Sequence, residues 1–324
     1  MIDTTIPVTI ATTAIADQNA ILARLAEFDR YARGALAKNT ERAIRADITR
    51  FVEFCAQCGM ASLPSTPETV AAFVDAMATH CAPATIRRYV SSISTYHQAA
   101  GLESPTRSMP VRLTLKKMSR EKGTRQTQAA PINRRLVNEM LESDRGTFRD
   151  LRDLALVLVG YDVLCRRSEL AALDVADFTF CEDGSGTVLI RRSKSDQEGA
   201  GAVRFIAPDT VERVKKWMKI AKIQQGAMFR GINNANAMEE RLSDKGVARA
   251  FKRMAALTGA DAEGISGHSC RVGAAQDMVS AGLEIAGVMQ AGGWKSPVMV
   301  ARYTEKLMAR RGASAQLARI QGRS

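Results

Sequence analysis

Two arginines, a histidine, a lysine and a tyrosine in the second half of the chain have side chains suited to chemistry on a phosphodiester. Two guanidinium groups can each donate paired hydrogen bonds to phosphate oxygens and neutralise the charge that develops on a pentavalent phosphorane. A lysine on a turn can donate a proton to a leaving oxygen, and a tyrosine hydroxyl can act as the nucleophile. The candidates are Arg166, Arg271, His268, Lys194 and Tyr303.

These residues lie in or just after four short segments. The first ends a long apolar helix predicted over 148–164, and the second occupies the turn between two predicted strands. The third places His268 at the start of a predicted helix, where unpaired backbone N–H groups favour an anion. Tyr303 follows the fourth, inside a helix predicted over 297–309. The segments read Asp162-Val-Leu-Cys-Arg-Arg-Ser-Glu-Leu170, Arg191-Arg-Ser-Lys-Ser-Asp196, Ser266-Gly-His-Ser-Cys-Arg-Val-Gly273 and Gly292-Gly-Trp-Lys-Ser-Pro297.

Each of these residues, taken alone, also fits an ordinary structural role. Arg166 beside Arg167 fits a surface pair, His268 fits a structural histidine, and Trp294 fits the core. The chain has five tyrosines, and the others are interpreted as packing or groove residues. The functional interpretation therefore depends on the whole set and on its order along the chain. The other tyrosines are Tyr31, Tyr89, Tyr96 and Tyr161.

The order of the motifs resembles the tyrosine recombinase, or phage integrase, family, and within it the Cre-type recombinases. That order is Arg-x-Ser-Glu-Leu, a hairpin Lys, Gly-His-x-x-Arg, Gly-Gly-Trp and Tyr. The stretches most similar to the Cre pattern are 242–251, 266–278 and 290–294. In architecture the resemblance covers the whole chain, whereas its specific motifs are confined to about 160–305.

The resemblance implies that Arg166 and Arg271 hold the scissile phosphate. It makes Lys194 the general acid for the leaving 5′ oxygen. Tyr303 would attack the phosphorus and form a 3′-phosphotyrosyl bond. The expected activity is site-specific recombination, in which strands are cleaved and rejoined through a Holliday junction.

The resemblance implies supporting roles for three further residues. His268 would donate a hydrogen bond and accept a proton, and Trp294 would donate its indole N–H to a phosphate oxygen. Glu169 would orient the groups of the site from behind them. Cys165 departs from the family pattern, which has a leucine-like residue there, but a thiol is small and semi-apolar enough to leave the assignment intact.

The elements that must position these residues are predicted to form two domains. Residues 1–16 are rich in Thr and Ala and are predicted to be a flexible tail. Apolar residues then recur at helical spacing over 17–118, which predicts a bundle of helices. The resemblance implies that this bundle is the core-binding domain, which binds DNA. Residues 119–131 begin with a polar, basic stretch that predicts a linker. Residues 132–324 form the predicted catalytic domain.

The predicted fold class is mainly α, with an α+β catalytic domain that contains a small β-sheet. The two predicted strands are 186–191 and 202–206, and both are short runs of β-branched and apolar residues. The remainder of this domain has helical periodicity. The expected architecture is therefore a helical-bundle core-binding domain followed by a tyrosine recombinase catalytic domain.

The balance of charge points to a polyanionic partner. The 324 residues carry a net charge of +12, which favours nucleic acid. We expect double-stranded DNA to be contacted by two basic helices of the first domain and by one of the second. A solvated helix face is the alternative for each single residue. The predicted DNA-binding residues are Arg42, Arg45, Arg87, Arg88, Lys245 and Arg249.

Other sequence features argue against a membrane, a disulfide framework and a metal. No apolar run of about 18 residues occurs, and the N-terminus does not read as a secretory signal, so we expect a cytoplasmic, nucleoid-associated protein. Six cysteines are scattered along the chain. Cys55 and Cys58 with His80 and Cys81 lack a second pair at zinc-finger spacing. Neither a P-loop nor an acidic cluster for two Mg²⁺ ions is found, so no cofactor is expected.

The chain continues past Tyr303 into a short amphipathic tail. Its apolar stripe, on a helix predicted at about 313–322, cannot bury itself. In the Cre pattern such a helix docks into a neighbouring protomer, so the resemblance implies a homotetramer on two DNA sites with inverted half-sites.

Three other functions compete with recombination. A type IB topoisomerase shares the chemistry but relaxes supercoils as a monomer, and the separate helical domain and the tail favour recombination. A non-catalytic DNA-binding protein of the same fold is disfavoured because all six catalytic positions carry suitable residues. A nuclease is disfavoured by the missing acidic cluster.

Overall fold

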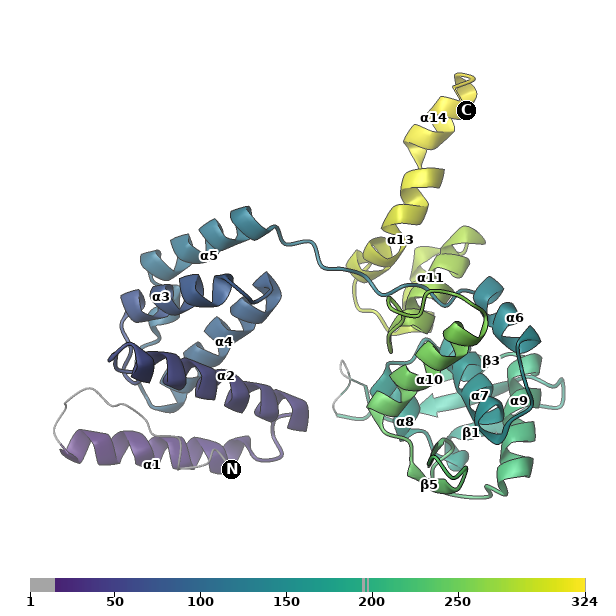
Figure 1. The fold of residues 1–324 in the computed structure, drawn as a ribbon, viewed down its shortest axis with the longest axis horizontal. Coiled ribbons are helices and arrows are strands. Elements are labelled where there is room, and N and C mark those ends of the chain that lie inside the picture. The colour runs from purple at the N-terminus through teal and green to yellow at the C-terminus, as the bar shows by residue number, and fades with distance from the viewer. Residues whose placement is uncertain (1–14, 194–195, 197, 324) are drawn as a thin grey trace. The chain divides into compact units, whose positions relative to one another are not determined.

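The computed structural model describes residues 15–193, 196 and 198–323, which form two compact units (Figure 1). The first unit comprises residues 1–126 and the second 127–324. The first is helical, and the second is mostly helical with two small sheets. The predicted fold class is therefore confirmed.

The first unit is a bundle of amphipathic helices around one aromatic core. Phe51 and Phe73 are fully buried, and their rings meet edge to face with centroids 5.1 Å apart. Thr66 caps the helix that follows it by accepting a hydrogen bond from the N–H of Thr69, as its position before Pro67 predicts. The elements are α1 (Ile15–Ala32), α2 (Lys38–Gln57), α3 (Pro67–Ala78), α4 (Pro83–Ala99), the short η1 (Pro105–Arg107) and α5 (Met109–Lys122).

The segment between the units is shorter than predicted. Helix α5 continues to Lys122, so the first four residues of the predicted linker, 119–122, are helical. The Lys122 ammonium donates to the carbonyls of Ala78 and Cys81, which holds this last turn against the end of α3. At the N-terminus, α1 begins at Ile15, two residues inside the predicted tail. The rest of that tail lies outside the described residues.

The second unit is built around α7 (Phe148–Val163), whose side chains are buried along almost its whole length. Helices α9, α10 and α11 pack against it. Strands β1 to β3 form an antiparallel sheet in that order, with Leu189 opposite Val203. The other helices are α6 (Arg134–Glu142), α8 (Arg167–Ala172), η2 (Val175–Asp177), α9 (Pro208–Ala221), α10 (Asp244–Leu257), α11 (Ser269–Ser280), α12 (Ile285–Gly292), α13 (Val298–Arg311) and α14 (Ala313–Ile320). The strands are β1 (Phe178–Phe180), β2 (Gly186–Ile190), β3 (Ala202–Ile206), β4 (Arg230–Ile232) and β5 (Met238–Arg241).

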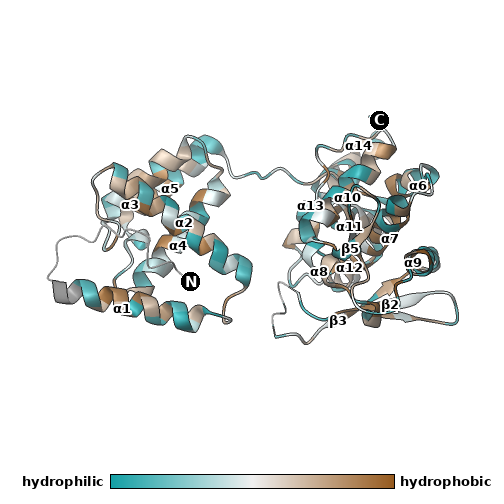
Figure 2. Ribbon diagram, turned by 60° about the horizontal axis from the view of Figure 1, so that its bottom comes forward, coloured by the Kyte–Doolittle hydropathy of each residue, from teal (hydrophilic) through white to brown (hydrophobic). Residues whose placement is uncertain are grey.

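Hydrophobic and hydrophilic residues alternate along the helices of both units (Figure 2). This pattern gives each amphipathic helix one face to bury.

A smaller cluster of buried side chains surrounds α11, separate from the main core around α7. It contains Leu164, Val272, Ala274, Ala275, Val288, Trp294, Val300 and Tyr303. Two of the predicted site residues are therefore also part of a packed core.

Acidification is expected to destabilise the first unit through His97. This side chain is fully buried; its Nε2 accepts a hydrogen bond from the N–H of Ser65, and its Nδ1 lies 2.9 Å from the carbonyl oxygen of Ile93. Burial lowers the pKa of His97 below its ordinary value of 6.5. Below pH 6.5 the unfolded chain binds a proton at this imidazole, whereas the folded chain binds it only once the pH falls below the lowered pKa. The contribution of His97 to the free energy of unfolding is therefore fully present above pH 6.5. It falls by about 1 kcal/mol per pH unit as the pH decreases from 6.5 to the folded pKa.

Calorimetry of the full chain between pH 7.5 and 5.5 measures this effect. The variant His97→Gln should lose most of the pH dependence of the first unit's transition. An unchanged dependence in that variant would assign the effect to other groups.

Candidate active site

A left-handed residue at the end of α7 directs the first motif into the site. Leu164 adopts φ 50°, which ends the helix and turns the chain into α8. Arg166 stands at the N-cap of α8, and its N–H donates to Glu169 Oε2 at 2.9 Å. Its guanidinium Nη1 also donates to Glu169 Oε1, at 2.6 Å. The largely buried Glu169 therefore fixes both the backbone and the side chain of Arg166.

Arg271 reaches the same place from the first turn of α11. Its guanidinium donates to the carbonyl of Leu164 and, at 3.0 Å, to the carbonyl of Gly292. The Cζ atom lies 4.7 Å from the centroid of the Trp294 ring, a cation–π arrangement. Burial lowers the pKa of Arg271, and the positive charge of Arg166 lowers it further. An anion bound between the two guanidinium groups would favour their charged forms and so oppose this lowering of the pKa.

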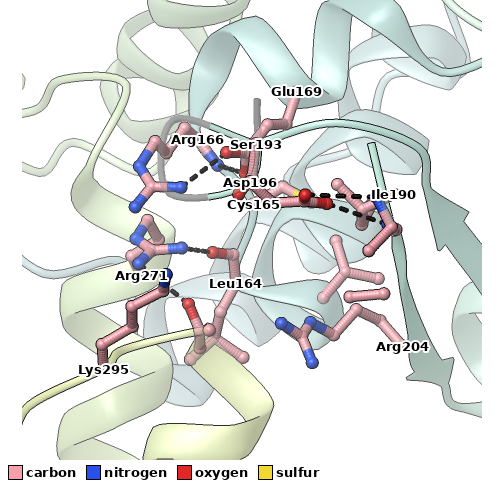
Figure 3. Close-up of a pocket in the computed structure, with 16 residues that line it drawn as sticks. Leu164, Cys165, Arg166, Glu169, Ile190, Ser193, Asp196, Arg204, Arg271 and Lys295 are labelled. Carbon is pink, nitrogen blue, oxygen red and sulfur yellow. Dashed lines mark hydrogen bonds and ion pairs between the residues drawn. The ribbon is translucent and has the colours of Figure 1, made fainter. Parts of the chain in front are cut away.

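The two arginines border a cavity of about 350 Å³ (Figure 3). Figure 3 shows their guanidinium groups one above the other beside the Leu164 carbonyl. Two further cations line this cavity and were not predicted from the sequence. Arg204 lies on β3 and donates to the carbonyl of Gln290 at 2.7 Å. Lys295 directly follows Trp294 and is exposed. The site is therefore more basic than its motifs indicate.

Trp294 and Tyr303 pack together beside Arg271. Their rings meet edge to face, with centroids 5.8 Å apart and planes at 76°. Both side chains are 9% exposed, and neither lines the cavity itself. The phenol of Tyr303 is nevertheless close enough for its charge to affect the pKa of Arg271. The structure therefore brings the predicted nucleophile close to Arg271, one of the two predicted phosphate-binding arginines.

His268 is the N-cap residue of α11, as predicted. Desolvation lowers the pKa of its imidazole, and the guanidinium groups of Arg271 and Arg167 lower it further. At neutral pH this favours the unprotonated ring, which can accept a proton. His268 is not among the residues that line the cavity.

Lys194 lies outside the described residues, but the hairpin loop that carries it borders the cavity. Ser193 and Asp196 line the cavity on either side of it. The Asp196 carboxylate accepts hydrogen bonds from the N–H groups of Gly201 at 2.8 Å, Gly199 at 3.0 Å and Ala200 at 3.1 Å. These bonds lower the pKa of Asp196, with that from Gly201 contributing most. The role of Lys194 stays a prediction.

The six predicted DNA-binding residues differ in their exposure and in the partners that hold them. Arg42 is exposed and donates to Asn39 at 3.0 Å, whereas Arg45 is half-buried. Arg88 pairs at 2.9 Å with the buried carboxylate of Asp47. The remaining three, Arg87, Lys245 and Arg249, are exposed, and Arg87 donates to Ser119 at 2.7 Å. Arg88 is therefore a structural residue of the α2–α4 contact as well as a candidate for DNA binding.

The variant Arg88→Ala is expected to lower the stability of the first unit by about 1–2 kcal/mol, because it leaves the Asp47 carboxylate buried with only Ser92 as a partner. Half of the Arg88 side chain is exposed, which keeps the loss below that of a fully buried pair. Arg42→Ala is the matched control, with an expected change within about 0.5 kcal/mol. Thermal unfolding of the full chain compares them, and equal midpoints would contradict the structural role of Arg88.

Among the residues that the structure describes, no group of three or more His, Cys, Asp or Glu side chains is placed to hold a metal ion. No described helix has both the length and the hydropathy needed to cross a membrane.

Two clustered arginines, their buried glutamate, and a histidine, tryptophan and tyrosine on one mixed helical unit place this chain among the tyrosine recombinases. The chain belongs to the phage integrase family, whose model matches residues 132–310. It is 33% identical over 281 residues to an integrase/recombinase XerD homolog of Selenomonas ruminantium, covering 83% of this chain and 82% of that protein. It is 27% identical over 307 residues to recombinase Cre of Escherichia phage P1, covering 88% and 89%.

Solved structures show the same fold. The XerH site-specific recombinase bound to a palindromic difH substrate matches with a TM-score of 0.66 at 18% identity, covering 94% of this chain and 91% of that one. The Tn1549 transposon integrase in complex with transposon right-end DNA matches with a TM-score of 0.65 at 13% identity, covering 90% and 99%.

Proposed function

We propose that this protein is a site-specific DNA recombinase that cleaves and rejoins DNA strands through a 3′-phosphotyrosyl intermediate. The observation that carries the proposal is the position of Arg166, held by Glu169, beside Arg271. Tyr303 packs against Trp294, whose ring lies under the Arg271 guanidinium. Family membership and the DNA complexes of the structural neighbours support it.

In the proposed first step, Arg166 and Arg271 bind the non-bridging oxygens of the scissile phosphate. The Tyr303 oxygen attacks phosphorus, the bond to the 5′ oxygen breaks, and the phenolic proton passes to neutral His268. Lys194 gives a proton to the leaving 5′ oxygen. In the second step a 5′ hydroxyl from the other duplex gives its proton to Lys194 and attacks phosphorus. The bond between phosphorus and the Tyr303 oxygen breaks, and His268 returns the proton to that oxygen. Each step exchanges one phosphodiester for another, so the bond energy is conserved without an external energy source.

The proposed partner is double-stranded DNA with inverted half-sites, bound by a homotetramer that forms a Holliday junction. The last helix, α14, supports the assembly because it buries none of its side chains. Leu317 is 50% exposed and Ile320 83% exposed. A helix with an uncovered apolar stripe fits a groove on another protomer.

Deleting residues 312–324 is expected to abolish synapsis while leaving single-site DNA affinity within about threefold. The deletion removes α14 but leaves α13, with Tyr303, complete. Gel-shift assays with one labelled and one unlabelled site separate the two properties. Normal recombination by the truncated protein would contradict a docking role for α14.

The function is tested by first selecting the preferred DNA site from a random half-site library. A plasmid carrying two copies of that site is then incubated with the full chain. Recombinant circles are the expected product. Relaxation without recombination would favour a topoisomerase, and binding without any cleavage would favour a non-catalytic DNA-binding protein.

A further inference from the structure

The first residues of the second unit lie directly on the helix that carries Arg271. We call residues 128–132 the linker strap. The N–H of Ala130 donates to the Gly264 carbonyl at 2.8 Å, and the N–H of Ile132 donates to the Ser269 carbonyl at 3.0 Å. A side chain at Gly273 would collide with the Ile132 carbonyl, so glycine permits this close approach. The strap is therefore fixed along the start of α11.

The first residue of the strap contacts the backbone of the proposed nucleophile. The side-chain amide of Gln128 donates to the carbonyl of Tyr303 at 3.1 Å. The amide of Gln276, on α11, donates to the same carbonyl at 2.8 Å. The next strap residue, Ala129, packs against the cluster that contains Trp294 and Tyr303. The backbone of Tyr303 is thus held both by α11 and by the segment that leads from the first unit.

We infer that Gln128 and Gln276 are positioning residues that hold the Tyr303 backbone in register with the two arginines; this rests on the proposed function. The attacking oxygen must lie within about 3–3.5 Å of phosphorus, and a displacement of about 1 Å can cost about 10²-fold in rate. Gln276 ties α13 to the helix that carries Arg271. Gln128 ties α13 to the linker strap, and five residues lie between Gln128 and the end of α5 at Lys122.

The test measures single-turnover formation of the covalent protein–DNA complex on a nicked substrate carrying the selected site. Gln128→Ala removes one donor and should slow the reaction about three- to tenfold with unchanged DNA affinity and unchanged thermal unfolding. Gln128→Glu keeps the size of the side chain but loses the donor, so it should be at least as slow. Gln128→Lys restores a donor and should recover most of the rate. Thr127→Ala, an exposed neighbour in the same segment, is the matched control.

Two outcomes separate this inference from the proposed function. If Gln128→Ala and Thr127→Ala react at the same rate as the wild-type chain, the inference is overturned and the recombinase function stands. If the wild-type chain forms no covalent complex, the proposed function fails and the inference fails with it. A wild-type rate in Gln128→Glu would show that the side chain acts by its shape and not as a hydrogen-bond donor, and would also overturn the inference.

Discussion

Replacing Tyr303 by phenylalanine is expected to abolish the covalent protein–DNA complex while leaving the fold and DNA affinity unchanged. The buried ring would keep its edge-to-face packing on Trp294, because only the hydroxyl is removed. Phenylalanine has no oxygen to attack phosphorus, so strand cleavage should fall by about 10⁴-fold or more. A nicked suicide substrate traps the intermediate, and a denaturing gel detects it.

Tyr96→Phe is the matched control for this experiment. This variant also removes one hydroxyl from a largely buried tyrosine, and burial raises the pKa of that hydroxyl to about 12. Tyr96, however, lies in the core of the first unit. The control should form the covalent complex at the wild-type rate. A covalent band that persists in Tyr303→Phe would show that another residue is the nucleophile.

The second large effect is expected at Arg271, where alanine should slow strand cleavage by about 10²- to 10³-fold or more. The guanidinium is proposed to neutralise charge on the phosphorane, and loss of one such preorganised donor typically has an effect of this size. The variant also leaves the Leu164 and Gly292 carbonyls without this donor, so a loss of stability of about 1–3 kcal/mol should accompany it.

The variant Arg271→Lys separates the contribution of the positive charge from that of the planar guanidinium. It keeps the charge but lacks the planar fork that pairs with two oxygens, so cleavage should recover only in part. Single-turnover rates and unfolding midpoints are measured for the same preparations. Arg135→Ala, at a highly exposed arginine of α6, is the control that should change neither. A wild-type cleavage rate in Arg271→Ala would remove this residue from the mechanism.

The helices and most of the candidate site could be predicted because their signals are local. Helix α3 begins as the sequence Thr66-Pro67 predicts, and α11 begins after His268. At the start of α2 the local signal is ambiguous, because asparagine is a favoured N-cap residue. The helix nevertheless begins at Lys38 after Ala37, and the Asn39 amide oxygen accepts a hydrogen bond from Arg42 inside the helix.

The features that could not be predicted depend on long-range contacts. Arg204 carries no motif, and only the pairing of β3 with β2 and its contact with the Gln290 carbonyl place it in the cavity. Strand β5 is exposed at every position, so it has no alternation of apolar and polar residues to reveal it. The polar residues 119–122 favour a linker by composition, yet the contacts of Lys122 with α3 and its following turn keep them helical.

The short segment between Lys122 and the linker strap has a consequence for the strength of DNA binding. Fully extended, it spans about 20 Å at most. In the proposed complex, once one unit has bound a half-site, the other unit is confined near the same duplex at an effective concentration on the order of millimolar. If both units contact DNA as proposed, the expected avidity is about 10²- to 10⁴-fold above that of either unit alone. Proteolysis after the exposed Arg125 would leave both folded units intact and remove this gain.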